Sequence, residues 1–391
     1  MRFAGVDIAR GTHIVAIADE ASTLVLKSTS VTDDAGGYER LIALIGSPTD
    51  ILVVMEATGH YWRNLFAYLC ARGFQCAVVN PLRVRRFAQE DLRRAKTDRT
   101  DAITIARFGA QKRPEPSPPP DRDLDDLRQL VQLHQRLSQD YGDRIRQLHR
   151  LLVLVFPEFT QVVRTLDSQR ATALLSRYPT AQAFREADTD ELARLHCGGR
   201  GALGAARAAS LVSAAATSVA QYGSTAYDVS VRAFCADLDT LRKSLRDAET
   251  QIEKSGRGHA LAAVLTSIDG LGTLTVGVLL ARLGDPAHFR NGAALASCVG
   301  VVPAISQSGQ VRPVELPSRP SGTRRCEQPC GCPRSTAIRH NPWLRTYYQR
   351  LIARGKPPKL AIVASMRKLL TAIYSVAKSR RPFVPNDARE A

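Results

Sequence analysis

Two apolar, strand-like runs near the N-terminus each carry an acid where a buried strand is normally uncharged. Asp7 interrupts the run FAGVDI, and Glu56 ends the run LVVME. A carboxylate in such a run is costly to bury unless something binds it. Two more acids, Asp98 and Asp101, are three residues apart at the start of a helical stretch and share one face of that helix. The sequence therefore predicts acids on strands and on an adjacent helix that converge in space.

Four converging carboxylates repel one another unless cations neutralise them, and hard divalent ions such as Mg²⁺ or Mn²⁺ are the usual solution. Two such ions about 4 Å apart can clamp the attacking and leaving oxygens of a phosphodiester. We therefore interpret Asp7, Glu56, Asp98 and Asp101 as metal ligands for nucleic-acid strand chemistry. Taken singly, the acids also fit a simpler interpretation. In it Asp7 is a turn residue, Glu56 caps the turn that follows it, and Asp98 caps a helix with Asp101 in the first turn.

The chain is strongly basic, which favours a polyanionic partner such as DNA or RNA. Its 391 residues, enough for two or three domains, include 54 Lys and Arg against 37 Asp and Glu, a net charge of +17. The positive charge is concentrated before the second pair of acids and near the C-terminus. We expect contacts to a nucleic-acid backbone from Arg83, Arg85, Arg86, Lys96, Lys356, Lys359, Arg367 and Lys368.

The location of the protein is inferred from missing signals. No apolar stretch reaches the roughly 20 residues that cross a membrane, and a strand pattern begins directly at the N-terminus, which predicts no signal peptide. Eight scattered cysteines in a chain of this length do not predict a disulfide framework. We therefore expect a cytoplasmic protein with no membrane partner.

Residues 1–112 alternate strand and helix patterns, which predicts an α/β domain with a mixed sheet. The first three strands are close enough for an antiparallel meander, and helices then cross over to further strands. The expected strands are 2–8, 12–19, 24–28, 50–55 and 75–79, and the expected helices are 37–45, 63–72, 81–90 and 98–111.

The rest of the chain is predicted to be mainly helical. A Pro-rich stiff linker, 113–121, is followed by a helical and coiled-coil region, 122–258, a small helical domain, 259–378, and a flexible tail, 379–391. One long helix has apolar residues alternately three and four apart, which is coiled-coil phasing. We expect helix pairing and a homo-oligomer, a dimer or a dimer of dimers, with an ordinary core helix as the alternative. The apolar positions are Val231, Phe234, Leu238, Leu241, Leu245, Ala248 and Ile252.

Two further motifs lie in the last domain. Gly270 and Gly272 of IDGLG precede an apolar helix, as in the turn of a helix-hairpin-helix, where glycines let backbone amides approach a phosphate. A plain turn is the alternative. The Ser-rich sequence GVVPAISQSG follows a packed helix and predicts a loop.

Together these motifs resemble the DEDD-type insertion-sequence transposases of the IS-one-ten family. GVDIA, MEATGHY and KTDRTDA, which carry Asp7, Glu56, Asp98 and Asp101, match that family's three acidic motifs. IDGLG and the Ser-rich loop match its second catalytic domain, and RGKPPKLAIVA with RKLL matches its C-terminal motif. The similarity runs over nearly the whole chain, in the same order.

The resemblance implies an RNase H-like, RuvC-like first domain, an inserted coiled coil and a small helical domain that carries a serine. It implies a transposase guided by a non-coding bridge RNA, in which the four acids hold Mg²⁺ or Mn²⁺ and Ser308 attacks DNA to give a phosphoserine intermediate. Ser306 is the competing serine. We prefer Ser308 because Gly309 follows it and allows close approach to a phosphate. A RuvC-like junction-resolving endonuclease and a non-catalytic basic nucleic-acid-binding protein are the alternatives.

One segment departs from the family pattern. Residues 313–337 hold five prolines, which forbid a continuous helix, and Cys326, Cys330 and Cys332, which lack a fourth zinc ligand at the usual spacing. If the gene is read in the neighbouring reading frame from the codon of Ser321, codons that the genetic code allows for these residues restore the family's Gly-Asn and Leu-Arg pattern. We therefore interpret 314–336 as a stretch between two compensating frameshifts and expect an impaired copy, which binds nucleic acid but recombines poorly.

Overall fold

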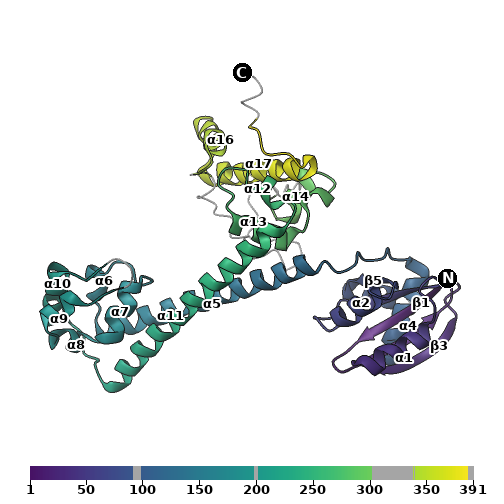
Figure 1. Ribbon diagram of the computed structural model, residues 1–391, viewed down its shortest axis with the longest axis horizontal. Helices are drawn as coiled ribbons and strands as arrows, with labels where there is room; N and C mark the ends of the chain where they lie inside the picture. The colour runs from purple at the N-terminus through teal and green to yellow at the C-terminus, as the bar shows by residue number, and fades with distance from the viewer. Residues whose placement is uncertain (91–97, 198–200, 302–337, 339, 386–391) are drawn as a thin grey trace, which may run out of the picture. The chain divides into compact units, whose positions relative to one another are not determined.

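The computed structural model of the chain describes residues 1–90, 98–197, 201–301, 338 and 340–385. The chain divides into two compact units, Met1–Arg122 and Asp123–Ala391, shown in Figure 1. All the strands of the described residues lie in the first unit. Its elements are β1 (Arg2–Ile8), β2 (Thr12–Ala18), β3 (Leu24–Thr32), α1 (Ala35–Ile45), β4 (Ile51–Glu56), α2 (Trp62–Cys70), β5 (Gln75–Val79), α3 (Pro81–Glu90) and α4 (Asp98–Lys112).

The five strands form one mixed sheet in the order β3-β2-β1-β4-β5. β1 pairs antiparallel with β2, and β2 with β3, whereas β4 lies parallel to β1 and β5 lies parallel to β4. The predicted mixed α/β sheet is confirmed. β3 continues to Thr32 instead of ending at residue 28, because its Ser and Thr side chains suit an exposed edge strand.

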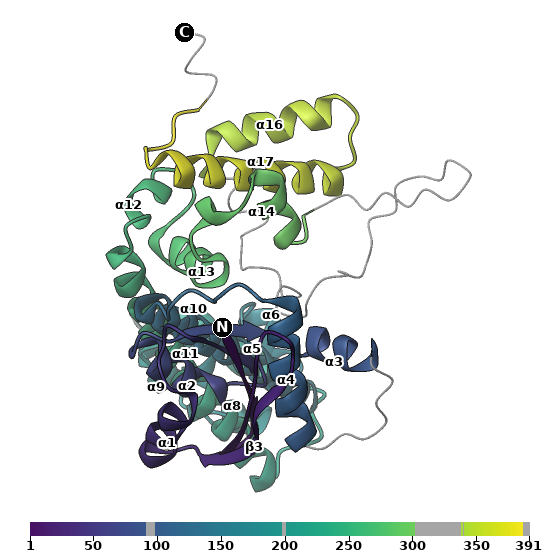
Figure 2. The same cartoon turned by 90° about the vertical axis from the view of Figure 1, so that its right-hand side faces the viewer.

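Helices cover both faces of the sheet. On one face, Val6 and Met55 of the central strands belong to an apolar cluster with Leu41 of α1 and Leu65 of α2. On the other face, residues of β1, β4 and β5 form a cluster with α3 and α4. Figure 2 shows α1 and α2 on one side of the sheet and α4 on the other.

Gly5 in β1 allows the backbone of α4 to lie directly on the sheet. A Cβ atom at Gly5 would come closer than 3.0 Å to the Ala106 nitrogen and to the Ala102 carbonyl oxygen, a separation that real side chains do not show. Gly109, one helical turn further along, is similarly close, since a Cβ there would lie 2.9 Å from Val54 Cγ2. Small residues on both elements therefore set the distance between α4 and the sheet.

The same contacts fix the direction of α4. Gly109 lies against Phe3, whereas Ala102 lies against Gly5. Because later residues of α4 meet earlier residues of β1, the helix runs antiparallel to that strand. The first turn of α4, which carries the second pair of acids, therefore extends toward the carboxyl ends of β1 and of its parallel neighbour β4.

The second unit consists of helices that build two apolar clusters. One cluster joins α6 to α10 with the later part of α5 and the earlier part of α11. The other joins α12 to α17 with the opposite ends of the same two long helices. The elements are α5 (Arg122–Val155), α6 (Phe159–Val162), α7 (Gln169–Arg177), α8 (Ala181–Arg185), α9 (Thr189–Arg194), α10 (Ala205–Ala216), α11 (Thr225–Gly258), α12 (Ala262–Leu265), α13 (Thr273–Leu283), η1 (Pro286–His288), α14 (Gly292–Cys298), α16 (Pro342–Ala353) and α17 (Pro358–Ser379).

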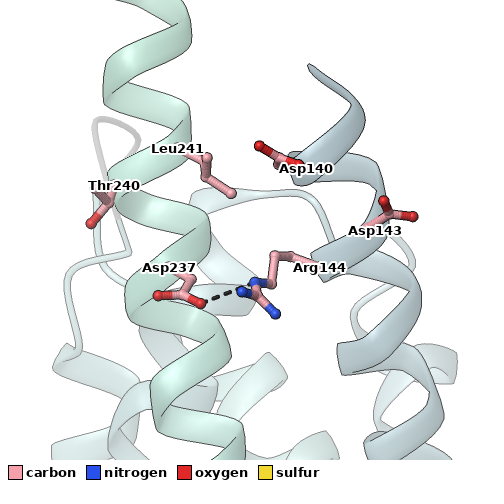
Figure 3. A pocket seen from close by; sticks show the side chains of 6 residues that line it. All are labelled: Asp140, Asp143, Arg144, Asp237, Thr240 and Leu241. Atoms are coloured by element: carbon pink, nitrogen blue, oxygen red, sulfur yellow. Dashed lines mark ion pairs between the residues drawn. The ribbon is translucent and has the colours of Figure 1, made fainter. Parts of the chain in front are cut away.

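Between the two clusters, polar contacts bridge α5 and α11. His134 Nε2 lies 3.2 Å from Glu249 Oε1, and Arg144 Nε lies 3.0 Å from Asp237 Oδ2, so the two helices run antiparallel. An open cleft of about 480 Å³ lies beside the second pair, and Figure 3 shows the carboxylates along its walls. Polar bridges of this kind separate the apolar clusters at the two ends.

The apolar seam predicted on α11 is buried mainly at its ends. Val231 and Leu238 belong to one cluster and Ile252 to the other, whereas Leu241 and Leu245 in the middle are half-buried. The coiled coil and the homo-oligomer stay predictions.

α17 corrects the expectation about apolar stretches. By length and composition alone this helix could cross a membrane, although the sequence had suggested that no segment is long enough. Leu369, Leu370, Ile373 and Val376 of α17 are buried in the C-terminal apolar cluster, which accounts for its composition without a membrane.

We expect Gly5→Ala to destabilise the first unit by about 3 kcal/mol or more, because the added methyl group overlaps backbone atoms that cannot rotate away. Trp62 lies in the first unit and Trp343 in the second, so in a Trp343→Phe background tryptophan fluorescence during urea unfolding reports on the first unit.

Gly36→Ala is the matched control for this substitution. Gly36 is an exposed residue of α1, and the nearest atom to a Cβ there is Asp34 Oδ1 at 3.6 Å. The same added methyl group should be neutral or stabilise the unit by about 0.4–1 kcal/mol. Equal unfolding midpoints for the two variants would contradict the close approach of α4.

Candidate functional site

Asp7 and Glu56 lie side by side at the carboxyl ends of two parallel strands. The register pairs Val6 of β1 with Met55 of β4, so the next residues along the two strands, Asp7 and Glu56, are neighbours on one face. Both side chains are half-buried. Asp7 has the same orientation as Gly5, two residues earlier, and therefore points to the face that α4 covers.

α4 brings Asp101 to the same face and the same end of the sheet. Asp101 is half-buried and precedes Ile105 and Phe108 by four and seven residues. Those two residues pack in the cluster with β4 and β5, so Asp101 lies on the helix face directed toward β4. Asp98 begins the helix, and its side chain lies outside the described part of the chain. Three predicted acids are thus held on three separate elements.

The turn after β4 holds Glu56 in place. Thr58 donates its hydroxyl to Glu56 Oε1 at 3.3 Å and its backbone N–H to the Glu56 carbonyl at 2.8 Å. Ala57 N–H donates to the Val79 carbonyl at 3.0 Å, which ties the turn to β5. The interpretation of Glu56 as a turn acceptor is therefore partly correct. Since a carboxylate has about four acceptor positions, this role is compatible with a second one as a metal ligand.

The carboxylates at this end of the sheet suit a hard divalent cation, because carboxylate oxygens are its preferred ligands. Among the residues that the structure describes, however, no group of three or more Asp, Glu, His or Cys side chains is close enough to hold a metal ion as it stands. A metal at Asp7, Glu56, Asp98 and Asp101 therefore stays a prediction.

The predicted phosphate-contacting residues differ in their surroundings. Arg83, Arg85 and Arg86 are exposed on α3, and Lys356, Lys359 and Arg367 are exposed near the C-terminus. Lys368 is half-buried instead, with Nζ 4.5 Å and 4.2 Å from the ring centroids of Trp343 and Tyr347. Its charge thus also stabilises the packing of α16 on α17 through cation–π contacts.

The IDGLG segment forms a fixed turn before α13. Gly270 has φ +85°, a conformation that favours glycine, whereas Gly272 is the N-cap of α13 with an ordinary φ of −70° and no side-chain cap. Asn341 donates its side-chain N–H to the Asp269 carbonyl at 2.8 Å and holds the turn. The proposed phosphate contact at these glycines stays a prediction.

Three predicted features lie outside the described residues. They are Lys96, the two serines Ser306 and Ser308, and the segment 313–337 that we interpret as frameshifted.

The buried cysteines Cys76 and Cys235 are poor nucleophile candidates. The five cysteines of the described part of the chain are free thiols. Burial raises the pKa of the Cys76 thiol and raises the pKa of Cys235 to about 12. Thiols with such values are protonated at neutral pH and unreactive.

The sequence interpretation missed the small residues that set the position of α4, and with it that of Asp101. Gly5 was read only as part of a motif, although a glycine inside an apolar strand is itself a sign of close backbone approach. The small residues Ala102, Ala106 and Gly109, at helical spacing, were the complementary sign on α4. The hydrogen bond from Thr58 to Glu56 agrees, by contrast, with the expected role of Glu56 in the turn that follows it.

Comparison with known proteins places both ends of the chain in one family. A transposase model of the DEDD IS110 type matches residues 4–157. A second model, described as transposase IS116/IS110/IS902 family, matches residues 262–349. The first match contains all four predicted acids and the second contains the Ser-rich loop, and together they cover more than half of the chain.

Individual relatives are similar over nearly their full lengths. The 43.6 kDa protein of insertion element IS110 from Streptomyces coelicolor is 26% identical over 87% of this chain and 84% of its own length. The pilin gene-inverting protein of Moraxella bovis is 23% identical over 97% of both chains. The 42 kDa protein of insertion element IS900 from Mycobacterium paratuberculosis is 26% identical over 98% of this chain and 97% of its own. The chain therefore belongs to the IS110/IS116/IS902 family of DEDD-type transposases.

Proposed function

We propose that this transposase cleaves and exchanges DNA strands to move an insertion sequence, with a metal-bound acidic site, a serine nucleophile and guidance by a non-coding RNA. The observation that carries the proposal is the placement of Asp7 and Glu56 on one face of adjacent strands, with Asp101 on the helix that covers that face. Three rigid elements thus hold acids at one end of the sheet, which is the arrangement that metal-dependent phosphodiester chemistry requires.

In this proposal Asp7, Glu56, Asp98 and Asp101 would hold Mg²⁺ or Mn²⁺ at the sheet edge. A bound divalent ion supplies charge neutralisation on the phosphate oxygens and favours ionisation of the attacking hydroxyl. Thr58 keeps the Glu56 carboxylate oriented through the hydrogen bond from its hydroxyl. The half-burial of the acids limits access of water to this edge.

Ser308 is the proposed nucleophile. Its Oγ forms a bond to phosphorus while one P–O bond of the DNA strand breaks, so one phosphodiester is exchanged for another and the hydroxyl proton passes to the departing oxygen. The phosphoserine bond conserves the energy of the broken bond, and strands can rejoin without a nucleotide cofactor. This agrees with the lack of a Gly-x-x-x-x-Gly-Lys-Ser phosphate loop in the sequence.

The partners follow from charge and from the relatives. A net charge of +17, with exposed arginines on α3, suits DNA and a guide RNA. The similarity to a pilin gene-inverting protein supports recombination between defined DNA sites rather than simple cleavage. The guide RNA belongs to the proposal through the family resemblance, and a dimeric or tetrameric assembly through the apolar spacing of α11. A cytoplasmic location stays an expectation from the sequence.

Asp7→Asn and Asp101→Asn should each lower magnesium-dependent strand cleavage by about 100-fold or more, because a metal ligand is lost and such ions contribute several kcal/mol. RNA affinity, measured by filter binding, should change little. Asp50→Asn is the control, since Asp50 is exposed and precedes β4 at the opposite end of the sheet. Full cleavage by the Asp7 and Asp101 variants would refute the metal assignment.

Ser308→Ala should eliminate covalent protein–DNA adducts on denaturing gels, whereas Ser306→Ala should retain them, because only Ser308 is expected to attack phosphorus. Cleavage without any adduct in a chain whose segment 314–336 carries the sequence of the neighbouring frame would favour the junction-resolving endonuclease, which uses the acids alone.

We expect the chain as written to form few adducts, because the prolines of 313–337 prevent the helix that would support the serine loop. A misplacement of about 1 Å can cost roughly 100-fold in rate. Replacing 314–336 with the sequence of the neighbouring frame should therefore increase adduct yield sharply. Equal yields before and after the replacement would show that the segment is dispensable.

A further inference from the structure

The turn between β4 and α2 presents an aromatic pair that the proposed chemistry leaves unused. His60 is exposed and its ring lies against that of Tyr61 in a tilted arrangement, with centroids 4.5 Å apart and ring planes inclined by 30°. Tyr61 is half-buried and packs against the apolar cluster beneath α1 and α2. The outer ring of the pair is thus exposed to solvent, while the inner ring is anchored in the fold.

The backbone of this turn is held in one conformation. Thr58 N–H donates to the Glu56 carbonyl at 2.8 Å, and Arg63 N–H donates to the His60 carbonyl at 3.2 Å. Gly59 has φ +57° and lies against the Tyr61 ring, since a Cβ at this position would be 3.6 Å from it. His60 is therefore displayed on a rigid base, so little entropy is lost when a ligand stacks on it.

The stability of the fold does not explain the position of His60. Its imidazole makes no hydrogen bond to any other residue that the structure describes, and its principal contact is the Tyr61 ring. An exposed ring in this position contributes little to folding, because most of its surface stays in water. An exposed aromatic ring that is backed by a second, anchored ring is instead the kind of surface on which a nucleobase stacks.

The pair also lies at the end of the sheet that carries Asp7 and Glu56. His60 follows Glu56 by four residues, so the two are at most about 13 Å apart along an extended chain and closer across a turn. α3 begins at the same edge, because Glu56 pairs with Val79 immediately before Asn80, and its exposed Arg83 adds positive charge. Tyr61 packs with the cluster on the α1 and α2 face, whereas Glu56 points to the α4 face, so the pair and the acids share one end of the sheet but not one face. A strand that crosses this end of the sheet could place a phosphate at Glu56 and an unpaired base on His60.

We infer that the tilted His60–Tyr61 pair is a nucleobase platform. An unpaired base of the DNA strand stacks on its exposed ring, close to the phosphate at the acidic edge, by which we mean the end of the sheet that carries Asp7, Glu56 and Asp101. The choice of DNA as substrate rests on the proposed function. Stacking is tolerant of sequence, because every base has an aromatic face. The platform therefore positions the strand for cleavage without selecting a target sequence.

The test is photo-crosslinking of the full-length chain to a single-stranded DNA oligonucleotide that contains 5-iodouracil, a base that forms crosslinks to aromatic side chains stacked on it. Peptide mapping should place a crosslink on His60 or Tyr61. His60→Ala should lower the yield of this crosslink by roughly 5- to 100-fold, the range that loss of one stacking contact produces. His60→Phe keeps a flat ring and should retain the yield.

Controls separate stacking from other effects. His149→Ala removes an exposed histidine of α5 and should leave the crosslink unchanged. Crosslinks elsewhere on the chain with none in residues 57–63 would overturn the inference. An equal loss of crosslink yield in His60→Ala and His60→Phe would overturn it too. Preferential crosslinking of an iodouracil RNA to the same peptide would overturn the assignment to DNA. Because crosslinking needs no cleavage, the platform and the proposed function can fail separately. A crosslink at His60 or Tyr61, with no cleavage even after 314–336 is replaced by the sequence of the neighbouring frame, would support the platform and refute the proposed function.

Discussion

The acidic edge depends on the contact between the backbone of α4 and the backbone of β1 at Gly5. With no side chain between them, the distance from helix to sheet is set by main-chain atoms, which cannot adopt other rotamers. The antiparallel course of α4 over β1 then determines which turn of the helix reaches the carboxyl ends of the strands. This packing places Asp101 on the same face and at the same end of the sheet as Asp7 and Glu56, and no direct attraction between the acids is required.

Carboxylates placed together oppose folding through mutual repulsion, so the surrounding structure must hold them. Here apolar clusters on both faces of the sheet supply that stability, with Val6 and Met55 on one side and Phe3 and Val54 on the other. Rigid elements position side chains more accurately than loops do. The one loop that contributes, after Glu56, is itself fixed by Thr58 and by the link from Ala57 to β5.

Sequence patterns predicted the strands and the mixed sheet, because apolar alternation is a local signal, and interrupting charges singled out the four acids as candidates. These patterns did not give the adjacency of β1 and β4, which places Asp7 beside Glu56, since pairing between distant strands has no local signal. The seam of α11 shows a related limit. Leu241 continues the same spacing as Leu238, yet only Leu238 is fully buried, because the apolar clusters lie at the two ends of the helix. In α17, similar apolarity reflects burial in a cluster rather than a membrane.

The proposed reaction needs groups from both units of the chain. The acids belong to Met1–Arg122, whereas Ser308 is more distant in sequence and belongs to Asp123–Ala391. Folding of the first unit can therefore form the acidic edge without bringing the serine to it. Metal binding and adduct formation report on two different events, the first internal to one unit and the second dependent on both. In this proposal, a defect confined to 313–337 would abolish strand exchange and leave the acidic edge and the His60–Tyr61 pair intact. DNA binding at the acidic edge and recombination could therefore be lost independently.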